Sequence, residues 1–156
     1  MLILVSALAV LGIGFLIMFL ISYVTRVRYT RAKLLTPGEL EFFRVLDVAV
    51  RKKYSVFAQV RLANLVNIPD KYFLWKNFNQ LGAKCVDFVL YDKNTGSTLI
   101  VIELDDKSHE RPERKTRDEF VNKVLKEAKI PILHLKYKYQ YNIPEILNSI
   151  AEKIQE

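Results

Sequence analysis

Two carboxylates lie in neighbouring apolar stretches of the chain, Asp87 within Cys85–Tyr91 and Glu103 within Leu99–Leu104. A cluster of turn-forming residues, Asp92–Ser97, separates the two stretches and predicts a β-hairpin. If the hairpin folds symmetrically about this turn, Asp87 falls opposite Glu103, at a separation of roughly 5 Å. Two like charges at that distance repel each other. A divalent cation bound by both carboxylates would offset the repulsion, and their oxygen ligands suit Mg²⁺ or Mn²⁺.

The alternative is that both carboxylates are ordinary solvated side chains near strand ends, with a different register between the strands. Their neighbours favour the metal site instead, because Val86 and Phe88 flank Asp87 in the same apolar manner as Ile102 and Leu104 flank Glu103. A charged side chain in apolar surroundings requires a compensating partner.

These residues carry a family resemblance. The order Val86-Asp87-Phe88, a short hairpin, Val101–Asp106 and then Ser108-His109 resembles the PD-(D/E)XK nuclease superfamily. Within it, the sequence is similar to an uncharacterised bacterial domain family and, more distantly, to very-short-patch-repair-type endonucleases. The resemblance implies a restriction-endonuclease-like α/β sandwich that hydrolyses phosphodiester bonds of nucleic acid. It also implies that Asp87 and Glu103 are the ligands of Mg²⁺ or Mn²⁺.

The resemblance is incomplete at one position. The superfamily carries a lysine two residues after the glutamate, and this chain has Asp105 there. Asp105 could add a metal ligand or orient the attacking water, and His109 could act as general base or donate to phosphate. Lys84 and Lys107 are candidates to replace the lysine, and the sequence does not choose between them. A catalytically inactive module that binds nucleic acid or a protein partner at the membrane therefore stays open as the alternative.

Residues Leu2–Val24 contain no charged side chain and are mostly large and apolar. At roughly 1.5 Å per residue, a helix of this length spans about 35 Å, enough for a bilayer core of about 30 Å. A cleaved signal peptide would carry a basic residue ahead of its apolar core, and the chain has none before Arg26. We therefore expect a retained transmembrane anchor over residues 1–25.

Residues 26–34 form a basic juxtamembrane linker. Its basic side chains precede the first acidic residue, Glu39: Arg26, Arg28, Arg31 and Lys33. The positive-inside rule places this flank in the cytoplasm, which predicts a single-pass protein of the inner membrane with a cytoplasmic C-terminal domain. The same cluster could contact anionic lipid headgroups.

Composition agrees with a single domain after the anchor. All 24 Lys and Arg residues lie beyond the apolar stretch, in about 130 residues, the size of one ordinary domain. The net charge of +7 suits phosphate or anionic lipid, and four of the positive charges belong to the juxtamembrane linker. Together with the family resemblance, this charge leads us to expect nucleic acid as the partner, DNA before RNA. The single cysteine allows no internal disulfide, and two histidines with one cysteine do not make an ordinary structural zinc site.

The other segments predict the elements that position the carboxylates. Thr36-Pro37-Gly38-Glu39 is a capping box that opens a helix. Relatives of the resembled fold often place an acidic residue from this helix beside the metal, so Glu39 has two candidate roles. Further segments predict a strand, a helix, a second strand parallel to the hairpin and a last helix: 56–63, 112–128, 130–135 and 142–154. The expected domain, residues 35–156, is thus an αβββαβ sandwich with a mixed sheet and one further helix.

An aromatic run with interleaved lysines, residues 71–78, lies between the first strand and the hairpin. Aromatic side chains among lysines could stack nucleic-acid bases, or they could pack on the core as a loop or short helix.

Overall fold

The computed structural model describes residues 1–25, 27–68, 79–105 and 112–155, with the backbone alone for 2–5, 7, 9 and 112–115. These residues form two compact units, Met1–Lys33 and Leu34–Glu156.

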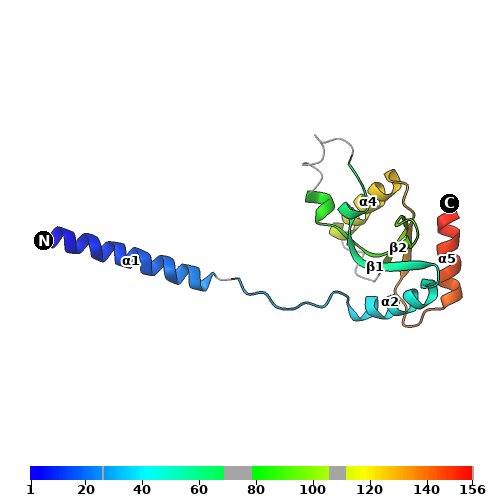
Figure 1. The fold of residues 1–156 in the computed structure, drawn as a ribbon, viewed down its shortest axis with the longest axis horizontal. Coiled ribbons are helices and arrows are strands. Elements are labelled where there is room, and N and C mark those ends of the chain that lie inside the picture. Colours follow the sequence, from blue (N-terminus) through cyan, green and yellow to red (C-terminus); the bar gives the residue numbers. More distant parts are fainter. Residues whose placement is uncertain (26, 69–78, 106–111, 156) are drawn as a thin grey trace. The chain divides into compact units, whose positions relative to one another are not determined.

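The first unit contains one long helix, α1 (Leu2–Val24), drawn in blue in Figure 1. The helix predicted from the uncharged stretch is therefore confirmed. Within the described part of the chain, however, no helix combines the length and the apolar character that a membrane span requires. The transmembrane assignment of α1 is not supported by this finding and stays a prediction.

In its described residues, the second unit is built on a four-stranded mixed sheet in the order β1-β2-β3-β4. Strand β1 (Tyr54–Arg61) pairs antiparallel with β2 (Cys85–Asp92), and β2 pairs antiparallel with β3 (Thr98–Asp105). Strand β4 (Ile132–Lys136) then pairs parallel with β3. The predicted hairpin and the predicted parallel strand after the crossover helix are both confirmed.

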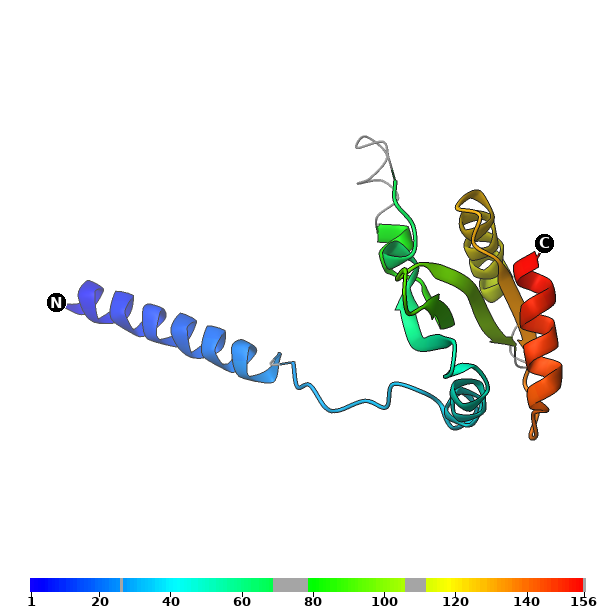
Figure 2. The same ribbon diagram turned by 45° about the vertical axis from the view of Figure 1, so that its right-hand side comes forward.

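One face of the sheet is covered by helices α2 (Pro37–Val50) and α5 (Ile143–Gln155) (Figures 1 and 2). Phe42 and Leu46 of α2 and Ile146 of α5 share one buried cluster with strand residues of even number: Phe88, Leu90, Ile100, Ile102 and Leu104. These even-numbered side chains share this face because side chains alternate along a strand.

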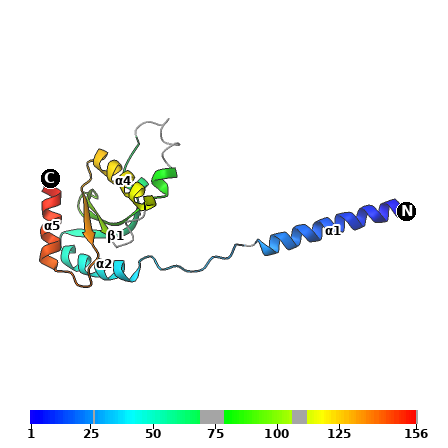
Figure 3. The ribbon, with the colours of Figure 1, turned by 180° about the vertical axis from the view of Figure 1, so that it is seen from behind.

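The other face is covered by helix α4 (Pro112–Glu127), drawn in yellow in Figure 3. Val121 and Leu125 of this helix pack with Val89 and Val101 in a second buried cluster. The odd-numbered residues of β3, Glu103 among them, therefore lie on the α4 side of the sheet.

Helix α2 begins with the predicted capping box. The Thr36 hydroxyl accepts from the Glu39 backbone N–H at 3.3 Å, and the Glu39 carboxylate accepts from the Thr36 backbone N–H at 2.6 Å. Both donors are helix-end groups that have no partner within the helix. The capping role predicted for Glu39 is thus confirmed.

Strand β1 ends two residues before the predicted limit. The chain turns into a short 3-10 helix, η1 (Leu62–Asn64), whose Leu62 is fully buried and donates its backbone N–H to the Lys84 carbonyl at 2.9 Å. Burial of this leucine at the end of the strand accounts for the difference.

At the end of the hairpin away from the turn, the two strands pair in the register that was predicted from the turn. Phe88 pairs with Ile102, which places Asp87 across from Glu103. Near the turn the register shifts between Leu90 and Tyr91, so the loop itself is not symmetric. The shift lies on the turn side of the carboxylates and leaves their pairing unchanged.

Candidate functional site

A row of polar residues crosses the sheet, with one residue from each strand: Gln59, Asp87, Glu103 and His134. The pairs Ala58–Phe88 and Val60–Val86 leave Gln59 opposite Asp87. Asp87 lies across from Glu103, and Glu103 is the partner of His134 in the parallel ladder. Neighbouring strands lie about 4.8 Å apart, and adjacent members of this polar row are cross-strand neighbours in the sheet.

The centre of the polar row is a carboxyl pair. Glu103 is 7% exposed, and among the described residues it is the one buried charged or polar residue. Burial, then the negative charge of Asp87 and a hydrogen bond with it, raise the pKa of Glu103 to about 9. At neutral pH and without a cation, Glu103 therefore carries a proton and donates it to the Asp87 carboxylate.

The backbone of β3 holds the second carboxylate in place. The Leu104 N–H donates to Oδ2 of Asp87 at 2.9 Å. Asp87 is thus oriented toward β3 by a hydrogen bond to the backbone as well as by its pairing with Glu103. Two carboxyl groups fixed in this way form a site with little freedom to move apart.

Helix α4 contributes a cation to this pair. Arg117 lowers the pKa of Glu103 against the larger opposing effects, and its Nη2 donates to the Cys85 carbonyl at 2.7 Å. Asp118 acts on the pKa of Glu103 in the opposite direction. Arg117 was not among the site residues predicted from the sequence. Its spacing from the buried Val121 could have indicated that Arg117 faces the sheet, because residues four apart share one face of a helix.

Asp105 lies beside the second histidine of the chain. Its Oδ1 is 3.3 Å from Nδ1 of His134, and Nε2 of His134 is 3.1 Å from Oδ1 of Asn122 on α4. His134 was not among the site residues predicted from the sequence. The structure places His134 next to Glu103 in the sheet and in contact with Asp105.

Glu39 is connected to the polar row through Gln59. Its Oε1 accepts from Nε2 of Gln59 at 3.2 Å, while its other oxygen caps α2. Gln59 has a φ of 53°, in the left-handed region that non-glycine residues rarely adopt. Such backbone strain within a strand is concentrated at functional sites, and here it lies directly opposite Asp87.

The predicted site residues have different outcomes. Asp87, Glu103 and Asp105 lie on adjacent strands, and Glu39 contacts Gln59, the residue opposite Asp87 on β1. Lys84 precedes β2 and lines, together with Arg117, a cavity of about 420 Å³. His109, Lys107 and the aromatic run at 71–78 lie outside the described residues.

The two central carboxylates fit a hard cation. Within the residues that the structure describes, no group of three or more His, Cys, Asp and Glu side chains is arranged to hold a metal ion. Mg²⁺ is usually bound by one or two carboxylates, and water and substrate phosphate oxygens complete its coordination. A site formed by Asp87 and Glu103 belongs to this open kind.

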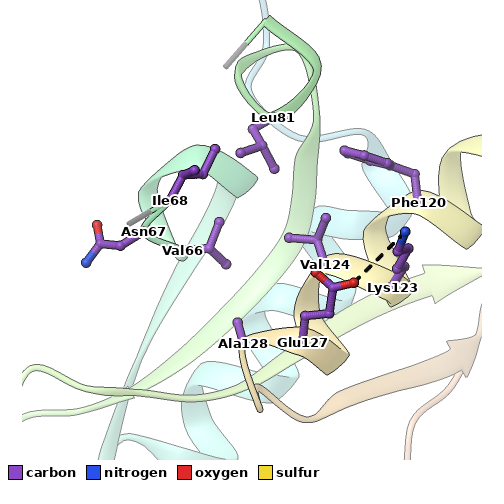
Figure 4. Close-up of a pocket in the computed structure, with 9 residues that line it drawn as sticks. All are labelled: Val66, Asn67, Ile68, Leu81, Phe120, Lys123, Val124, Glu127 and Ala128. Carbon is purple, nitrogen blue, oxygen red and sulfur yellow. Dashed lines mark ion pairs between the residues drawn. The ribbon is translucent and has the colours of Figure 1, made fainter. Parts of the chain in front are cut away.

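A separate cavity of about 500 Å³ lies beside the C-terminal half of α4 (Figure 4). Val66, Ile68, Leu81 and Phe120 form much of its apolar wall, and an ion pair between Lys123 and Glu127 at 4.0 Å lies at its edge. The residues lining it include no member of the polar row, so it is distinct from the carboxylate site.

Comparison with known proteins identifies a domain family. A family model described as protein of unknown function (DUF2726) matches residues 31–154, which include all the described strands, the helices α2 and α4, and all but the last residue of α5. The curated proteins and the solved structures contain no match to the chain. The resemblance to the nuclease superfamily therefore has no confirmation from these comparisons.

Proposed function

We propose that this chain, which belongs to the DUF2726 family of proteins of unknown function, is a metal-dependent nuclease-like phosphodiesterase that acts on nucleic acid. The observation that carries the proposal is the pair formed by Asp87 and Glu103. A buried carboxyl group beside a second carboxylate is unfavourable for a purely structural role, where an apolar residue of similar size is usually at least as stable. The pair therefore supports a chemical role.

The side chains around the pair have complementary roles in this proposal. Asp87 and Glu103 would hold Mg²⁺ or Mn²⁺, and an ion bound there would supply the charge that polarises a scissile phosphate and lowers the pKa of a water. Arg117, positioned by the Cys85 carbonyl, supplies the positive charge that the superfamily lysine would provide. Asp105 orients the water and is itself positioned by His134. His109 keeps the role of general base on the strength of the sequence alone.

The same site supports a second candidate, a catalytically inactive nuclease-fold module that binds nucleic acid or a protein partner. The observation that favours it is Asp105, an acidic residue in the lysine position, whose carboxylate contacts His134. A carboxylate can orient water but cannot stabilise the negative charge that develops on phosphate.

Cleavage of a mixed nucleic-acid panel separates the two candidates. With Mn²⁺ or Mg²⁺, the full-length protein should cleave at least one of single-stranded DNA, duplex DNA or RNA, and chelation should abolish the activity. Glu103→Gln should lower the rate by at least about 10²-fold, since loss of an outer-shell group alone costs about 10- to 100-fold. Glu152→Gln, which changes an exposed glutamate on α5, is the matched control and should leave the rate unchanged.

Binding without cleavage under every metal condition would contradict the enzyme and favour the binding module. Equal rates in the wild type and Glu103→Gln would exclude this pair as the catalytic site.

We further propose that α1 tethers the domain to the inner membrane with the domain in the cytoplasm. The support is its uncharged sequence and the exposed large apolar side chains along it, among them Leu11, Phe15 and Phe19. Exposed apolar surface of this extent is normally covered by lipid or protein.

Fractionation tests the tether. Full-length protein should sediment with membranes and resist a carbonate wash, because a helix in the bilayer core is not released by charge repulsion. A C-terminal tag should become sensitive to protease only when the cytoplasmic side is opened. A variant that begins at Leu34 should remain in the soluble fraction as the control. Detection in cells of a soluble, cleaved form of the protein that lacks the first 25 residues would exclude a retained anchor.

A further inference from the structure

A groove of about 630 Å³ lies along β1 and β2, beside the polar row. Its lining includes Phe57, Gln59 and Arg61 of β1, Tyr91 of β2 and Asn64 of η1. The groove is on the α4 side of the sheet, because Phe57 is the cross-strand partner of Val89, which packs against that helix.

The wall of the groove carries two parallel aromatic rings. The rings of Phe57 and Tyr91 are stacked, with centroids 4.6 Å apart and an interplanar angle of 10°. Phe57 is nevertheless 53% exposed, whereas its neighbours Val56 and Ala58 pack against the buried cluster under α2 and α5. Each ring therefore covers one face of the other, and the part of the Phe57 ring that stays exposed is the flat aromatic surface of the groove.

The groove also reaches one member of the polar row, Gln59. Gln59 lies two residues beyond Phe57 along β1, lines the same groove and is opposite Asp87. Two residues of an antiparallel strand span roughly 7 Å, about the length of two stacked nucleotides at about 3.4 Å each. A base stacked on Phe57 would therefore place a nearby phosphate of its strand beside Gln59, one strand away from Asp87.

The polar groups of the groove fit the same ligand. Arg61 is exposed at the end of β1, and a guanidinium group pairs well with phosphate oxygens. Asn64 adds an amide that can hydrogen-bond to sugar or base edges. A flat aromatic surface, a cation and an amide within one groove have the chemistry that binds an unpaired nucleotide.

We propose that Phe57 and Tyr91 form a stacking platform for an unpaired base, so that the substrate of the carboxylate site is a single-stranded or locally unpaired nucleic acid. The inference rests on the proposed function and specifies the strand form of its substrate. Bases within an intact duplex are stacked on one another and cannot lie flat on a protein side chain without leaving the helix.

The test compares strands with and without bases. Binding of the full-length protein in mild detergent is measured by fluorescence anisotropy with chelator present, so that no strand is cut. The probes, each about 12 nucleotides long, a typical site size, are single-stranded DNA, single-stranded RNA, the DNA duplex and an abasic DNA strand. Wild type should bind the base-containing single strands more tightly than the duplex or the abasic strand.

Phe57→Leu should weaken binding of the base-containing single strands about 5- to 150-fold, the range for loss of one base–aromatic stack. It should leave the abasic strand unaffected, and Phe57→Tyr should retain the wild-type affinity because the ring is kept. Tyr139→Leu, which removes a 91% exposed aromatic residue elsewhere, is the matched control and should change nothing. Tighter binding of single-stranded RNA than of single-stranded DNA would identify RNA as the preferred ligand, and it would support the stacking platform as well as the opposite preference would.

Unchanged affinity in Phe57→Leu, or an equal loss for the abasic strand, would overturn the platform. Should circular dichroism show that Phe57→Leu is unfolded, Tyr91→Leu provides the same comparison from the second ring. The two proposals fail separately. Base-dependent binding without cleavage removes the enzyme and keeps the platform, whereas cleavage independent of both rings removes the platform and keeps the enzyme.

Discussion

Glu103→Gln should unfold with nearly the same free energy at about pH 5.5 and pH 8.5, whereas the wild type loses stability across this range. The pKa of Glu103 is raised from 4.5 to about 9 in the folded protein. Between these values the folded state holds one more proton than the unfolded state, so rising pH favours unfolding. The stabilising contribution is complete below about pH 4.5 and is lost as the pH rises through about 9.

The expected slope is large. One bound proton corresponds to about 1.4 kcal/mol per pH unit, so three units correspond to about 4 kcal/mol. The side-chain amide introduced by Glu103→Gln does not titrate, yet it can still donate to Asp87. The slope from this site should therefore disappear without loss of the hydrogen bond.

Urea unfolding followed by circular dichroism, with chelator present, measures this slope. Glu152→Gln, which removes an exposed glutamate on α5, is the control and should retain the wild-type slope. Asp87→Asn should reduce the slope only in part, because burial remains the largest cause of the raised pKa of Glu103. Parallel pH profiles for wild type and Glu103→Gln would show that Glu103 is ionised in the folded protein.

Binding of Mn²⁺ should tighten about 100-fold between pH 6 and pH 8 and release about one proton. A carboxyl group must lose its proton before it binds a metal, so the two ions compete for Glu103. With a pKa of about 9, most of the metal-free protein carries this proton at both pH values. The apparent affinity then rises about tenfold for each pH unit.

Titration calorimetry in two buffers of different protonation enthalpy measures both the affinity and the proton release. Glu103→Gln should lose the proton release together with most of the affinity. Glu152→Gln should retain both. An affinity independent of pH would mean that the metal binds elsewhere or that Glu103 is already ionised, and it would remove the carboxyl pair as the metal site.

The pH dependence of stability and the binding of Mn²⁺ can also be measured together. If Mn²⁺ displaces the proton, the metal should raise the stability of the wild type more at high pH than at low pH, because ligand binding to the folded state adds to its stability. A steep pH dependence of stability without any metal effect would instead indicate that the carboxyl pair is a structural feature.

Local patterns in the sequence were enough to predict most of the elements of the second unit. The capping box at Thr36 predicts the start of α2 because all its partners lie within four residues. The turn at Asp92–Ser97 likewise predicts the pairing of Asp87 with Glu103, since a hairpin brings together residues that are close in sequence. The register shift near Tyr91 was not predictable, because it depends on how the side chains near the turn pack.

Other members of the site depended on tertiary structure. Gln59, Arg117 and His134 come from segments separated from the hairpin by longer connections, and each reaches the carboxyl pair through sheet order or helix packing. The left-handed conformation of Gln59 likewise has no local sequence signal such as glycine.

The sequence by itself determined which two carboxylates meet, because strand alternation and a short turn act over a few residues. Only the tertiary structure decided the chemical state of that pair. The pKa of Glu103 depends mainly on its burial on the α4 side of the sheet, and then on the charge of Asp87. Burial is a property of the assembled layers, since no residue of the hairpin can exclude water from its own face without the helix packed against it.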